Sequence, residues 1–599
     1  VSIANVSGDG GAEVEKWVAQ EPDVPIRDVS KEPVRMGVFI CHCGVNIGGY
    51  VDVPEVVAYA RTLPFVAYAA DNLYTCSVDA QKSIIEMIGE HHLNRVVVAS
   101  CTPRTHEPLF QDVLRKSGLN PYLFNMANIR DQCSWVHMDD KAAATQKAKD
   151  LVRMAAGKAV FARQLERKKI GVTKSALVIG AGMAGMSAAL ALSGMGFKVT
   201  VCEKSDRVGG NALRLSTTLS GRPVQGFIAA TAQRVRNDPL IELFTGSTIA
   251  RVEGYVGNFK TTLHTPAGPR EIEHGAAVIA VGALEEAPKE YGYGSLEGVV
   301  THSELDGAFA GADDALLTRA KSARSIVMIQ CAACRRPERP YCSRVCCNQA
   351  VRNAIAVLEA NPDCGVTVLY RDMRTYGMAE RLYRRARQLG VTFIRYDEDD
   401  KPKVTSNGGR LRVSVNSPML AQTLRIDADT VSLASAIVPD AQGNRELAQL
   451  FKVPINQDGF FMEAHAKLRP VDFATEGVYV CGLAHNPRDL KESIAQGKAA
   501  AARAATVISK ETLETEGTIA SVDISQCTGC GSCEKVCAYG AITVGDVSLR
   551  GAALRRAQVN EVLCKGCGTC AANCRCGAVD VSGFTDRQIV GELESLLRA

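Results

Sequence analysis

The chain has 599 residues, which at roughly 150 residues per domain corresponds to about four domains. Its 46% hydrophobic content, 22% charged content and net charge of +4 are ordinary for a globular protein, and they argue against nucleic acid or a membrane surface as a partner. The sequence has no long apolar run and no secretory leader, so we expect no transmembrane segment and a cytoplasmic location. The 22 cysteines are unusual, and in a reducing compartment such cysteines usually bind metal or carry out redox chemistry.

The first part of the chain predicts a tail, a small α/β domain and a connecting helix. Residues 1–33 are polar and aperiodic, which is typical of a surface tail. Residues 34–140 alternate apolar strands, as at 36–40 and 95–100, with helices, as at 53–62. Residues 141–170 are rich in Ala, Lys and Arg with helical spacing, and they predict a long linking helix over 141–167.

A dinucleotide-binding motif opens the next region. Gly180, Gly182 and Gly185 follow the apolar strand at 175–180 and begin a helix, and Glu203 ends the following strand. The glycines allow a tight turn and a close approach to a pyrophosphate, the helix N-terminus faces its charge, and the acid binds a ribose. This complete strand, turn, helix and acid pattern predicts a dinucleotide site.

The sequence that follows resembles the flavoprotein disulfide-reductase family, of the thioredoxin-reductase kind. Lys204, Gly209 and Gly210 continue the motif, and the strands at 277–283 and 478–485 are similar to that family's later flavin strands. The resemblance implies FAD, with Gly282 and Gly482 as further contacts, and NAD bound directly is the alternative. It also implies a double Rossmann core, which we divide into an FAD-binding domain at 171–305, a second Rossmann-like domain at 306–450, and a return to the FAD-binding domain at 451–510.

The second Rossmann-like unit carries cysteines where its relatives carry a glycine loop for NAD(P)H. Residues 331–347, between the strand at 324–330 and the helix at 348–360, contain five cysteines and no glycine. Without glycine the backbone cannot approach a pyrophosphate, so we expect that nicotinamide binding is lost and a metal centre replaces it. Two of these cysteines on their own would resemble a redox dithiol. An iron–sulfur cluster is the competing interpretation of the loop. The expected ligands are Cys331, Cys342, Cys346 and Cys347, with Cys334 as a spare or alternate ligand.

The C-terminal segment, residues 511–599, repeats the bacterial ferredoxin spacing C-x2-C-x2-C-x3-C. In that pattern three cysteines bind one [4Fe–4S] cluster and the fourth binds the other cluster. Two structural zinc sites are the alternative, but zinc favours pairs of cysteines with a wider gap. The predicted ligand sets are Cys527, Cys530, Cys533 with Cys574, and Cys564, Cys567, Cys570 with Cys537.

The chain from Val34 to the C-terminus resembles the A-type subunits of heterodisulfide reductase. The similarity lies in CHCGVNI (41–47), RVVVASCTPRTHEPLF (95–110), NPYLFNMANIRDQCSWVH (120–137), the loop PYCSRVCCNQA and YRDMRTYG (370–377). The resemblance implies a further [4Fe–4S] cluster in the N-terminal domain, held by four of five cysteines, with Cys41 ranked as the fifth; buried, unligated thiols are the alternative. These five are Cys41, Cys43, Cys76, Cys101 and Cys133.

The family resemblance implies one FAD and four [4Fe–4S] clusters that carry out flavin-based electron bifurcation or confurcation. The implied partners are B- and C-type subunits (HdrB/HdrC-like), ferredoxin, and a hydrogenase, formate dehydrogenase or similar input module with an iron–sulfur adaptor, in a dimeric complex. Bifurcating members resemble G-P-K-D near the flavin, where this chain has Asn486-Pro-Arg488-Asp489. Arg488 keeps the positive charge but cannot donate a proton as lysine can, and Lys491 is a candidate substitute. The alternatives are a self-contained NAD(P)H-linked or dithiol oxidoreductase and a passive electron-wiring scaffold.

Overall fold

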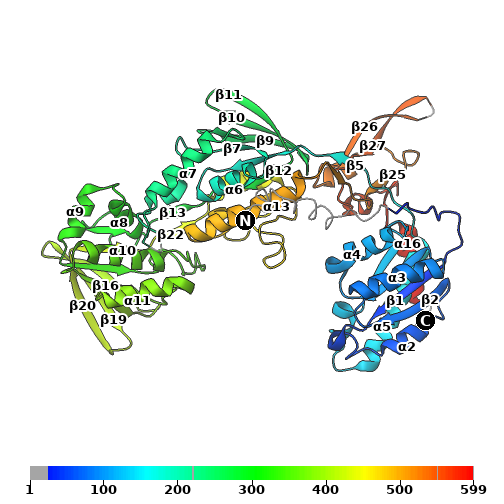
Figure 1. The fold of residues 1–599 in the computed structure, drawn as a ribbon, viewed down its shortest axis with the longest axis horizontal. Helices are drawn as coiled ribbons and strands as arrows, with labels where there is room; N and C mark the ends of the chain where they lie inside the picture. Colours follow the sequence, from blue (N-terminus) through cyan, green and yellow to red (C-terminus); the bar gives the residue numbers. More distant parts are fainter. Residues whose placement is uncertain (1–23, 219–220, 550, 598–599) are drawn as a thin grey trace, which may run out of the picture. The chain divides into compact units, whose positions relative to one another are not determined.

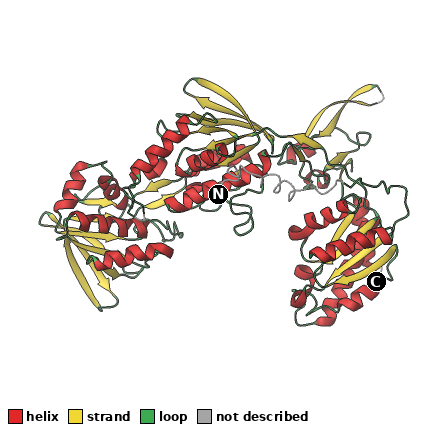
Figure 2. Cartoon of the chain, in the orientation of Figure 1, coloured by secondary structure: helices red, strands yellow, loops and turns green. Residues whose placement is uncertain are grey.

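The computed structural model describes residues 24–218, 221–549 and 551–597. Most of the predicted tail, residues 1–23, lies outside the described residues. The chain forms two compact units, Val1–Lys169 with Glu514–Ala599, and Ile170–Leu513 (Figures 1 and 2). The ferredoxin-like segment therefore shares a unit with the N-terminal domain, although the two are far apart in sequence.

The N-terminal domain is a four-stranded parallel sheet covered by helices. The strand order is β2 (Val66–Asn72), β1 (Met36–Cys41), β3 (Arg95–Ser100) and β4 (Phe124–Asn128). Every residue of β1 and β3 is buried, as expected for the central strands of a parallel sheet. The covering helices include α2 (Val53–Ala60), α3 (Val78–Glu90) and α4 (Pro103–Lys116). The predicted α/β domain is confirmed.

The predicted linking helix is shorter than expected and does not act as a linker. Helix α5 (Lys141–Val160) ends seven residues before the predicted end, and its alanine and valine face lies in the core beneath the sheet. Beyond the helix, the Asn120 side chain hydrogen-bonds to both the N–H and the carbonyl of Leu165. These long-range hydrogen bonds hold a segment that is not helical, which the local helical pattern did not reveal.

The C-terminal segment is built from two similar halves. Strands β25 (Ala520–Val522) and β28 (Val579–Val581) pair, as do β26 (Ile542–Leu549) and β27 (Ala552–Val559). Each cysteine loop leads into a short helix, α14 (Ser532–Val536) or α15 (Thr569–Ala572). The last helix, α16 (Asp586–Leu597), packs on α5, and Gly157 and Gly591 allow the close approach.

The second unit contains two parallel five-stranded sheets, each with helices around it. The strands of the first sheet have the order β23 (Val478–Val480), β12 (Ala276–Ile279), β6 (Ser175–Ile179), β7 (Lys198–Cys202) and β8 (Ile241–Phe244). Helices α6 (Met183–Ser193), α7 (Gln225–Asn237) and α13 (Leu490–Ile508) accompany this sheet, with α6 and α13 side by side (Figure 1). A three-stranded antiparallel sheet adjoins it, formed by β9 (Thr248–Tyr255), β10 (Asn258–Thr265) and β11 (Gly268–His274).

The second sheet has the strand order β14 (Val299–Thr301), β21 (Thr430–Leu433), β15 (Ser325–Ile329), β16 (Gly365–Tyr370) and β17 (Thr392–Arg395). Helices α8 (His302–Phe309), α9 (Asp314–Ser322), α10 (Cys346–Ala360) and α11 (Glu380–Gln388) accompany it. An antiparallel sheet of β18 (Lys403–Asn407), β19 (Arg410–Ser417) and β20 (Gln422–Ala428) follows. Two Rossmann-like sheets in one unit confirm the predicted double core.

The boundaries within this core differ from the predicted ones. Strand β14 already belongs to the second sheet, before the predicted boundary at residue 306. Helix α12 (Ala441–Phe451) buries Ala448 and Phe451 in the core of the first sheet, so the chain returns to that core before residue 451. Strands β13 (Leu284–Glu286) and β22 (Ala436–Val438) pair where the chain passes between the two sheets. Among the described residues, no helix is long and apolar enough to cross a membrane.

Candidate flavin and iron–sulfur sites

The glycine turn after β6 has the shape that a dinucleotide requires. Gly180 has φ +104°, and a Cβ there would lie 2.4 Å from the carbonyl oxygen of Ala280. At Gly185 a Cβ would lie 1.9 Å from the carbonyl oxygen of Gly180, so helix and strand approach too closely for any side chain. Gly182, at the N-cap of α6, has free space around it instead. The turn is thus closely packed at Gly180 and Gly185 and leaves free space at Gly182, in front of the N-terminus of α6. This arrangement fits a pyrophosphate.

The second glycine pair completes this cradle. The Gly209 N–H donates to the Ala181 carbonyl over 2.8 Å, and Gly209 forms a parallel bridge with Gly182. Gly210 is next to Gly182 as well, because a Cβ on Gly210 would lie 3.3 Å from the Gly182 Cα. The Glu203 carboxylate, at the end of β7, accepts a hydrogen bond of 2.6 Å from the Ala181 N–H.

Lys204 and Gly282 lie in different settings. The Lys204 ammonium forms an ion pair of 2.9 Å with Asp440, the N-cap of α12, and points to that helix. Gly282 has φ +75° with open space around its Cα. Its neighbour Ala283 accepts a hydrogen bond from the Asn211 amide over 2.9 Å, which connects this turn to the segment after Gly210.

The turn after β23 carries a buried hydrogen-bond network. The Gly482 N–H donates to the Gln496 side-chain oxygen over 2.8 Å. This bond fixes the orientation of the Gln496 amide, whose nitrogen donates to His485 Nδ1 over 2.7 Å. The Arg488 guanidinium donates to the same nitrogen over 3.0 Å. Nδ1 therefore accepts, and the Nε2–H donates to the Glu463 carboxylate over 2.6 Å. Burial lowers the pKa of His485, in agreement with a neutral ring.

Of the two candidate catalytic residues, only Arg488 is directed into this network. Its guanidinium also donates to the Asn486 side chain over 2.7 Å, and burial lowers its pKa. Arginine nonetheless stays charged, because its ordinary pKa lies above 12. Lys491 is exposed in the first turn of α13. The structure thus does not support Lys491 as a substitute proton donor.

Four of the five loop cysteines form one group of thiols. Cys331, Cys334, Cys346 and Cys347 lie close enough to influence one another electrostatically. Cys346 and Cys347 are the first two residues of α10, which begins two residues earlier than predicted, and a helix N-terminus favours thiolates. Cys342 instead accepts a hydrogen bond from the Arg344 N–H over 3.3 Å. The predicted spare residue, Cys334, belongs to this group.

The cysteine loop packs against both late flavin strands. Tyr341, Val345 and Leu483 all pack against a small apolar cluster that includes Ala283. Ala283 and Leu483 directly follow Gly282 and Gly482. The Arg344 guanidinium reaches the same region, donating to the Pro487 carbonyl over 3.2 Å and pairing with Glu492 at 2.8 Å. The cysteine loop therefore touches the segment expected to hold the flavin.

A buried ion pair near the flavin cradle was not predicted from the sequence. The Asp306 carboxylate, with a side chain 0% exposed, pairs with Arg352 of α10 at 2.7 Å. It also accepts hydrogen bonds from the N–H and the hydroxyl of Ser216, at 2.9 and 2.6 Å. Both charged residues lie in helices of the second sheet, whereas Ser216 follows the Gly209–Gly210 segment. An acidic and a basic residue 46 positions apart give no sequence signal for such a pair.

Four of the five N-terminal cysteines lie near one another, and the fifth lies apart from them. Cys41, Cys43, Cys76 and Cys101 lie close enough to influence one another electrostatically, and Arg130 is near them. Cys133 is completely buried, and its thiol donates to the Ala144 carbonyl over 3.0 Å. Burial raises the pKa of Cys133 to about 11. The structure therefore sets Cys133 apart, and does not favour the expectation that Cys41 is the fifth cysteine.

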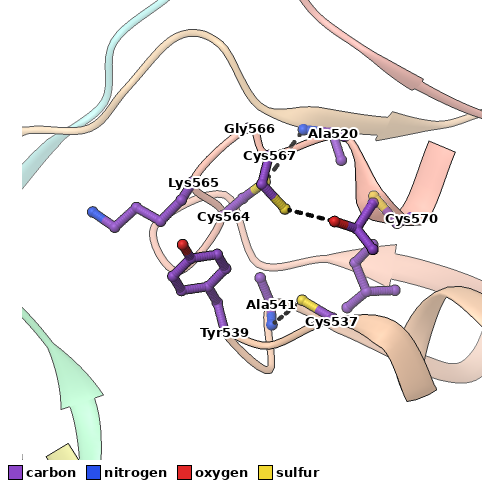
Figure 3. A pocket seen from close by; sticks show the side chains of 12 residues that line it. Ala520, Cys537, Tyr539, Ala541, Cys564, Lys565, Gly566, Cys567 and Cys570 are labelled. Carbon is purple, nitrogen blue, oxygen red and sulfur yellow. Dashed lines mark hydrogen bonds between the residues drawn. The ribbon is translucent and has the colours of Figure 1, made fainter. Parts of the chain in front are cut away.

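Four ferredoxin-type cysteines line one small pocket, Cys537 together with Cys564, Cys567 and Cys570 (Figure 3). The backbone N–H groups of Ala520 and Ala541 donate to Cys564 and Cys537, over 3.3 and 3.2 Å. Thiolates with N–H donors in an apolar setting fit a cubane cluster. This group includes the remote Cys537, as the predicted exchange of the fourth ligand requires.

The other half has the corresponding arrangement. The Ala557 N–H donates to Cys527 over 3.5 Å, and Cys527, Cys533 and Cys574 contact the same apolar cluster as their counterparts. An additional thiol is present here, because Cys576 lies 3.6 Å from Cys574. In the parts of the chain that the structure describes, no three His, Cys, Asp or Glu side chains form a site for a single metal ion.

Comparisons with known proteins agree with these sites. Residues 526–578 match the family model of the 4Fe-4S dicluster domain, and residues 178–230 match that of the NAD(P)-binding Rossmann-like domain. The A-type subunit of the H(2):CoB-CoM heterodisulfide,ferredoxin reductase of Methanothermobacter marburgensis is 36% identical over 664 residues, covering 95% of this chain and 98% of the relative. The second A-type iron-sulfur subunit of the CoB--CoM heterodisulfide reductase of Methanopyrus kandleri is 36% identical, covering 86% of this chain and 92% of the relative.

The chain belongs to the heterodisulfide reductase family of A-type subunits. It is an oxidoreductase that carries a 4Fe-4S dicluster domain. Among solved structures, thioredoxin reductase of Lactococcus lactis matches 56% of this chain and 99% of its own, at 17% identity and a TM-score of 0.41.

Proposed function

We propose that this heterodisulfide reductase A-type subunit holds one FAD and four [4Fe–4S] clusters and exchanges electrons between them. FAD can supply the conversion between two-electron and one-electron transfer, since each cubane carries one electron. The observation that carries the proposal is the packing of the cysteine loop, through Tyr341, Val345 and Arg344, against the segments that follow Gly282 and Gly482. A cluster in that loop would adjoin the flavin.

The proposed FAD site uses the two glycine segments and the turns after β12 and β23. The tight turn at Gly180 and Gly185, with free space over Gly182, supports a pyrophosphate at the N-terminus of α6. Glu203 directly follows β7, where the acid of this motif binds a ribose. The proposed contacts are Gly180, Gly182, Gly185, Glu203, Gly209, Gly210, Gly282 and Gly482.

The proposed cluster ligands follow the thiol groups described above. In the N-terminal domain we propose the four cysteines that lie near Arg130, because Cys133 is directed to a backbone carbonyl. In the C-terminal domain we propose the exchanged sets predicted from the spacing, supported by the pocket shared by Cys537 with Cys564, Cys567 and Cys570. The fourth cluster lies in the loop 331–347.

In the complex, we propose that this protein performs flavin-based electron bifurcation or confurcation. A mid-potential donor, a high-potential acceptor and a low-potential ferredoxin would be the three electron partners. The proposal includes B- and C-type subunits, an input module such as a hydrogenase or formate dehydrogenase, and a dimeric complex. The name of the Methanothermobacter marburgensis relative, which belongs to a heterodisulfide,ferredoxin reductase, supports ferredoxin as one partner.

Arg488 supplies a fixed positive charge beside the proposed flavin. Its guanidinium is held by His485 and Asn486, and His485 is held in turn by Glu463. An anionic reduced cofactor would be stabilised by this charge, whereas arginine gives up no proton at physiological pH. Any proton transfer there must come from another group or from water.

The test is anaerobic purification of the native complex with identification of its subunits, followed by reduction of the bound flavin. We expect B- and C-type partners, and flavin that is bleached by reduced ferredoxin but not by NAD(P)H added to the isolated protein. Rapid bleaching by NAD(P)H alone would support a self-contained oxidoreductase. Flavin that ferredoxin cannot reduce would support a passive scaffold.

A further inference from the structure

Two buried hydroxyl groups lie beside the N-terminal cysteines without a hydrogen-bond partner. Thr75 is 0% exposed and Ser100 is 2% exposed. Among the described residues, neither hydroxyl oxygen has a group at hydrogen-bond distance. A buried hydroxyl of this kind costs free energy, because it has given up its hydrogen bonds to water. Such groups are rare in folded proteins, and a bound cofactor that supplies the acceptor is one physical reason for them.

The chain around Thr75 runs along Cys41. Cys41 and Asn72 are paired at the ends of β1 and β2. Three residues after Asn72, the Thr75 N–H donates to the Cys41 sulfur over 3.4 Å. Thr75 also directly precedes Cys76 in the sequence. Thr75 therefore adjoins two of the four grouped cysteines, one through a hydrogen bond of its N–H and the other through the chain.

Ser100 lies at the same edge of the sheet. It is the last residue of β3, and the residue before it, Ala99, pairs with Ile40 of β1. Cys41 directly follows Ile40, so Ser100 and Cys41 come next in this register, at the carboxyl ends of two neighbouring parallel strands. Cys101 directly follows Ser100. The residue that carries the second hydroxyl therefore also adjoins two cysteines of the group.

Cluster sulfurs are the acceptors that these hydroxyls lack. The thiolate and sulfide sulfurs of a [4Fe–4S] cluster accept hydrogen bonds, and these bonds are stronger in the reduced cluster, which carries one more negative charge. A donor therefore favours the reduced cluster and raises its reduction potential. The C-terminal domain has comparable contacts, because the Ser532 and Thr569 hydroxyls each lie 3.5 Å from a cysteine sulfur.

We propose that the Thr75 and Ser100 hydroxyls donate hydrogen bonds to sulfur atoms of the N-terminal [4Fe–4S] cluster and raise its reduction potential. Neither residue is a ligand of the cluster. The cysteines hold the iron, and the two hydroxyls make this cluster a better electron acceptor than it would be in an apolar setting. The inference rests on the proposed N-terminal cluster and specifies what sets its potential.

The test measures the reduction potential of that cluster in the full chain, purified without oxygen and with its clusters. Cys101→Ala identifies the cluster, because it removes about four irons and one electron paramagnetic resonance signal of the reduced protein. Thr75→Val and Ser100→Ala each remove one hydroxyl, and each should keep full iron and lower the potential at which that signal appears. We expect about a tenfold shift of the reduction equilibrium in each variant, which is about 59 mV for one electron. Thr75→Ser keeps a hydroxyl and should keep the wild-type potential.

Thr430→Val is the matched control. Thr430 is also 0% exposed and its hydroxyl also has no partner among the described residues, but it lies in β21 of the other unit. Its removal should leave the potential unchanged. A wild-type potential in Thr75→Val or in Ser100→Ala would overturn the inference, as would equal shifts in Thr75→Val and Thr75→Ser. Unchanged iron in Cys101→Ala would overturn the proposed cluster itself.

For a variant that fails to fold, the wild-type protein provides a second measurement. After a brief transfer to D2O, hydroxyl hydrogens are replaced by deuterium ahead of hydrogen-bonded amides. Electron–nuclear double resonance at the signal of the N-terminal cluster should then detect deuterium coupled to the cluster. A spectrum without such coupling would contradict the inference.

Discussion

Replacement of Asp306 by alanine should strongly destabilise the second unit. The Asp306 carboxylate is 0% exposed, and its partner Arg352 is 10% exposed. Removing the carboxylate leaves a buried guanidinium without its counter-ion and Ser216 without its acceptor. Breaking one side of a buried ion pair typically costs about 3–5 kcal/mol. We expect a loss in this range for Asp306→Ala, and a smaller loss for Asp306→Ala combined with Arg352→Met, which removes both charges.

The matched control is Asp427→Ala, which removes an ion pair between Asp427 and Arg412 at 2.8 Å with side chains 41% and 38% exposed. A solvent-exposed ion pair contributes little to stability, so this variant should be nearly neutral. Native-state hydrogen exchange of peptides from α8 and α10 gives the opening free energy of the region directly. Tryptophan fluorescence would not serve, because residues 170–513 contain no tryptophan. Equal losses for Asp306→Ala and Asp427→Ala would refute this reasoning.

Three further predictions concern the flavin cradle, the N-terminal cluster and pH. Gly185→Ala should reduce flavin retention by about tenfold or more, because the added Cβ would lie 1.9 Å from the Gly180 carbonyl oxygen. Gly226→Ala is the control, because a Cβ there meets free space and the variant should retain flavin. Equal flavin absorbance in the two purified variants would contradict this prediction. Cys101→Ser should lower iron by about four per chain and Cys133→Ser should not, as an iron assay will show. Burial lowers the pKa of His274 to about 4, compared with about 6.5 in the unfolded chain. The neutral His274 ring therefore makes its full contribution to the free energy of unfolding above pH 6.5, and this contribution is lost as the pH falls towards 4. At pH 5 this loss is about 2 kcal/mol, and urea unfolding at pH 7 and pH 5 should show a smaller pH effect for His274→Gln.

The sequence predicted those features whose signal is local. The glycine turn, the cysteine-rich loop and the ferredoxin spacing each lie within a short segment, and the structure has the strand and helix of the turn where the pattern indicates them. The resemblance to the flavoprotein disulfide-reductase family implied both Rossmann-like sheets, whose buried parallel strands are continuous apolar runs in the sequence. The grouping of Cys537 with Cys564 also followed from spacing, because the repeat itself implies the exchange.

Other features depend on contacts between distant residues, which one sequence does not encode in a local pattern. The Asp306–Arg352 pair and the choice of Cys133 as the separate thiol are of this kind. The end of α5 was misjudged because the Asn120 side chain competes with helical hydrogen bonds at Leu165. Lys204 and Lys491 were assigned to the flavin site because they lie near its motifs in the sequence. In the structure Lys204 pairs with Asp440, and Lys491 is exposed.

The central claim is one flavin with four cubane clusters in this chain. The most direct measurement is the ratio of iron, acid-labile sulfide and FAD in the protein purified without oxygen. Four clusters of four irons each predict about 16 irons and about 16 sulfides per FAD. A ratio of about 8 irons per FAD would contradict the claim, because only the two ferredoxin-type clusters would then be present.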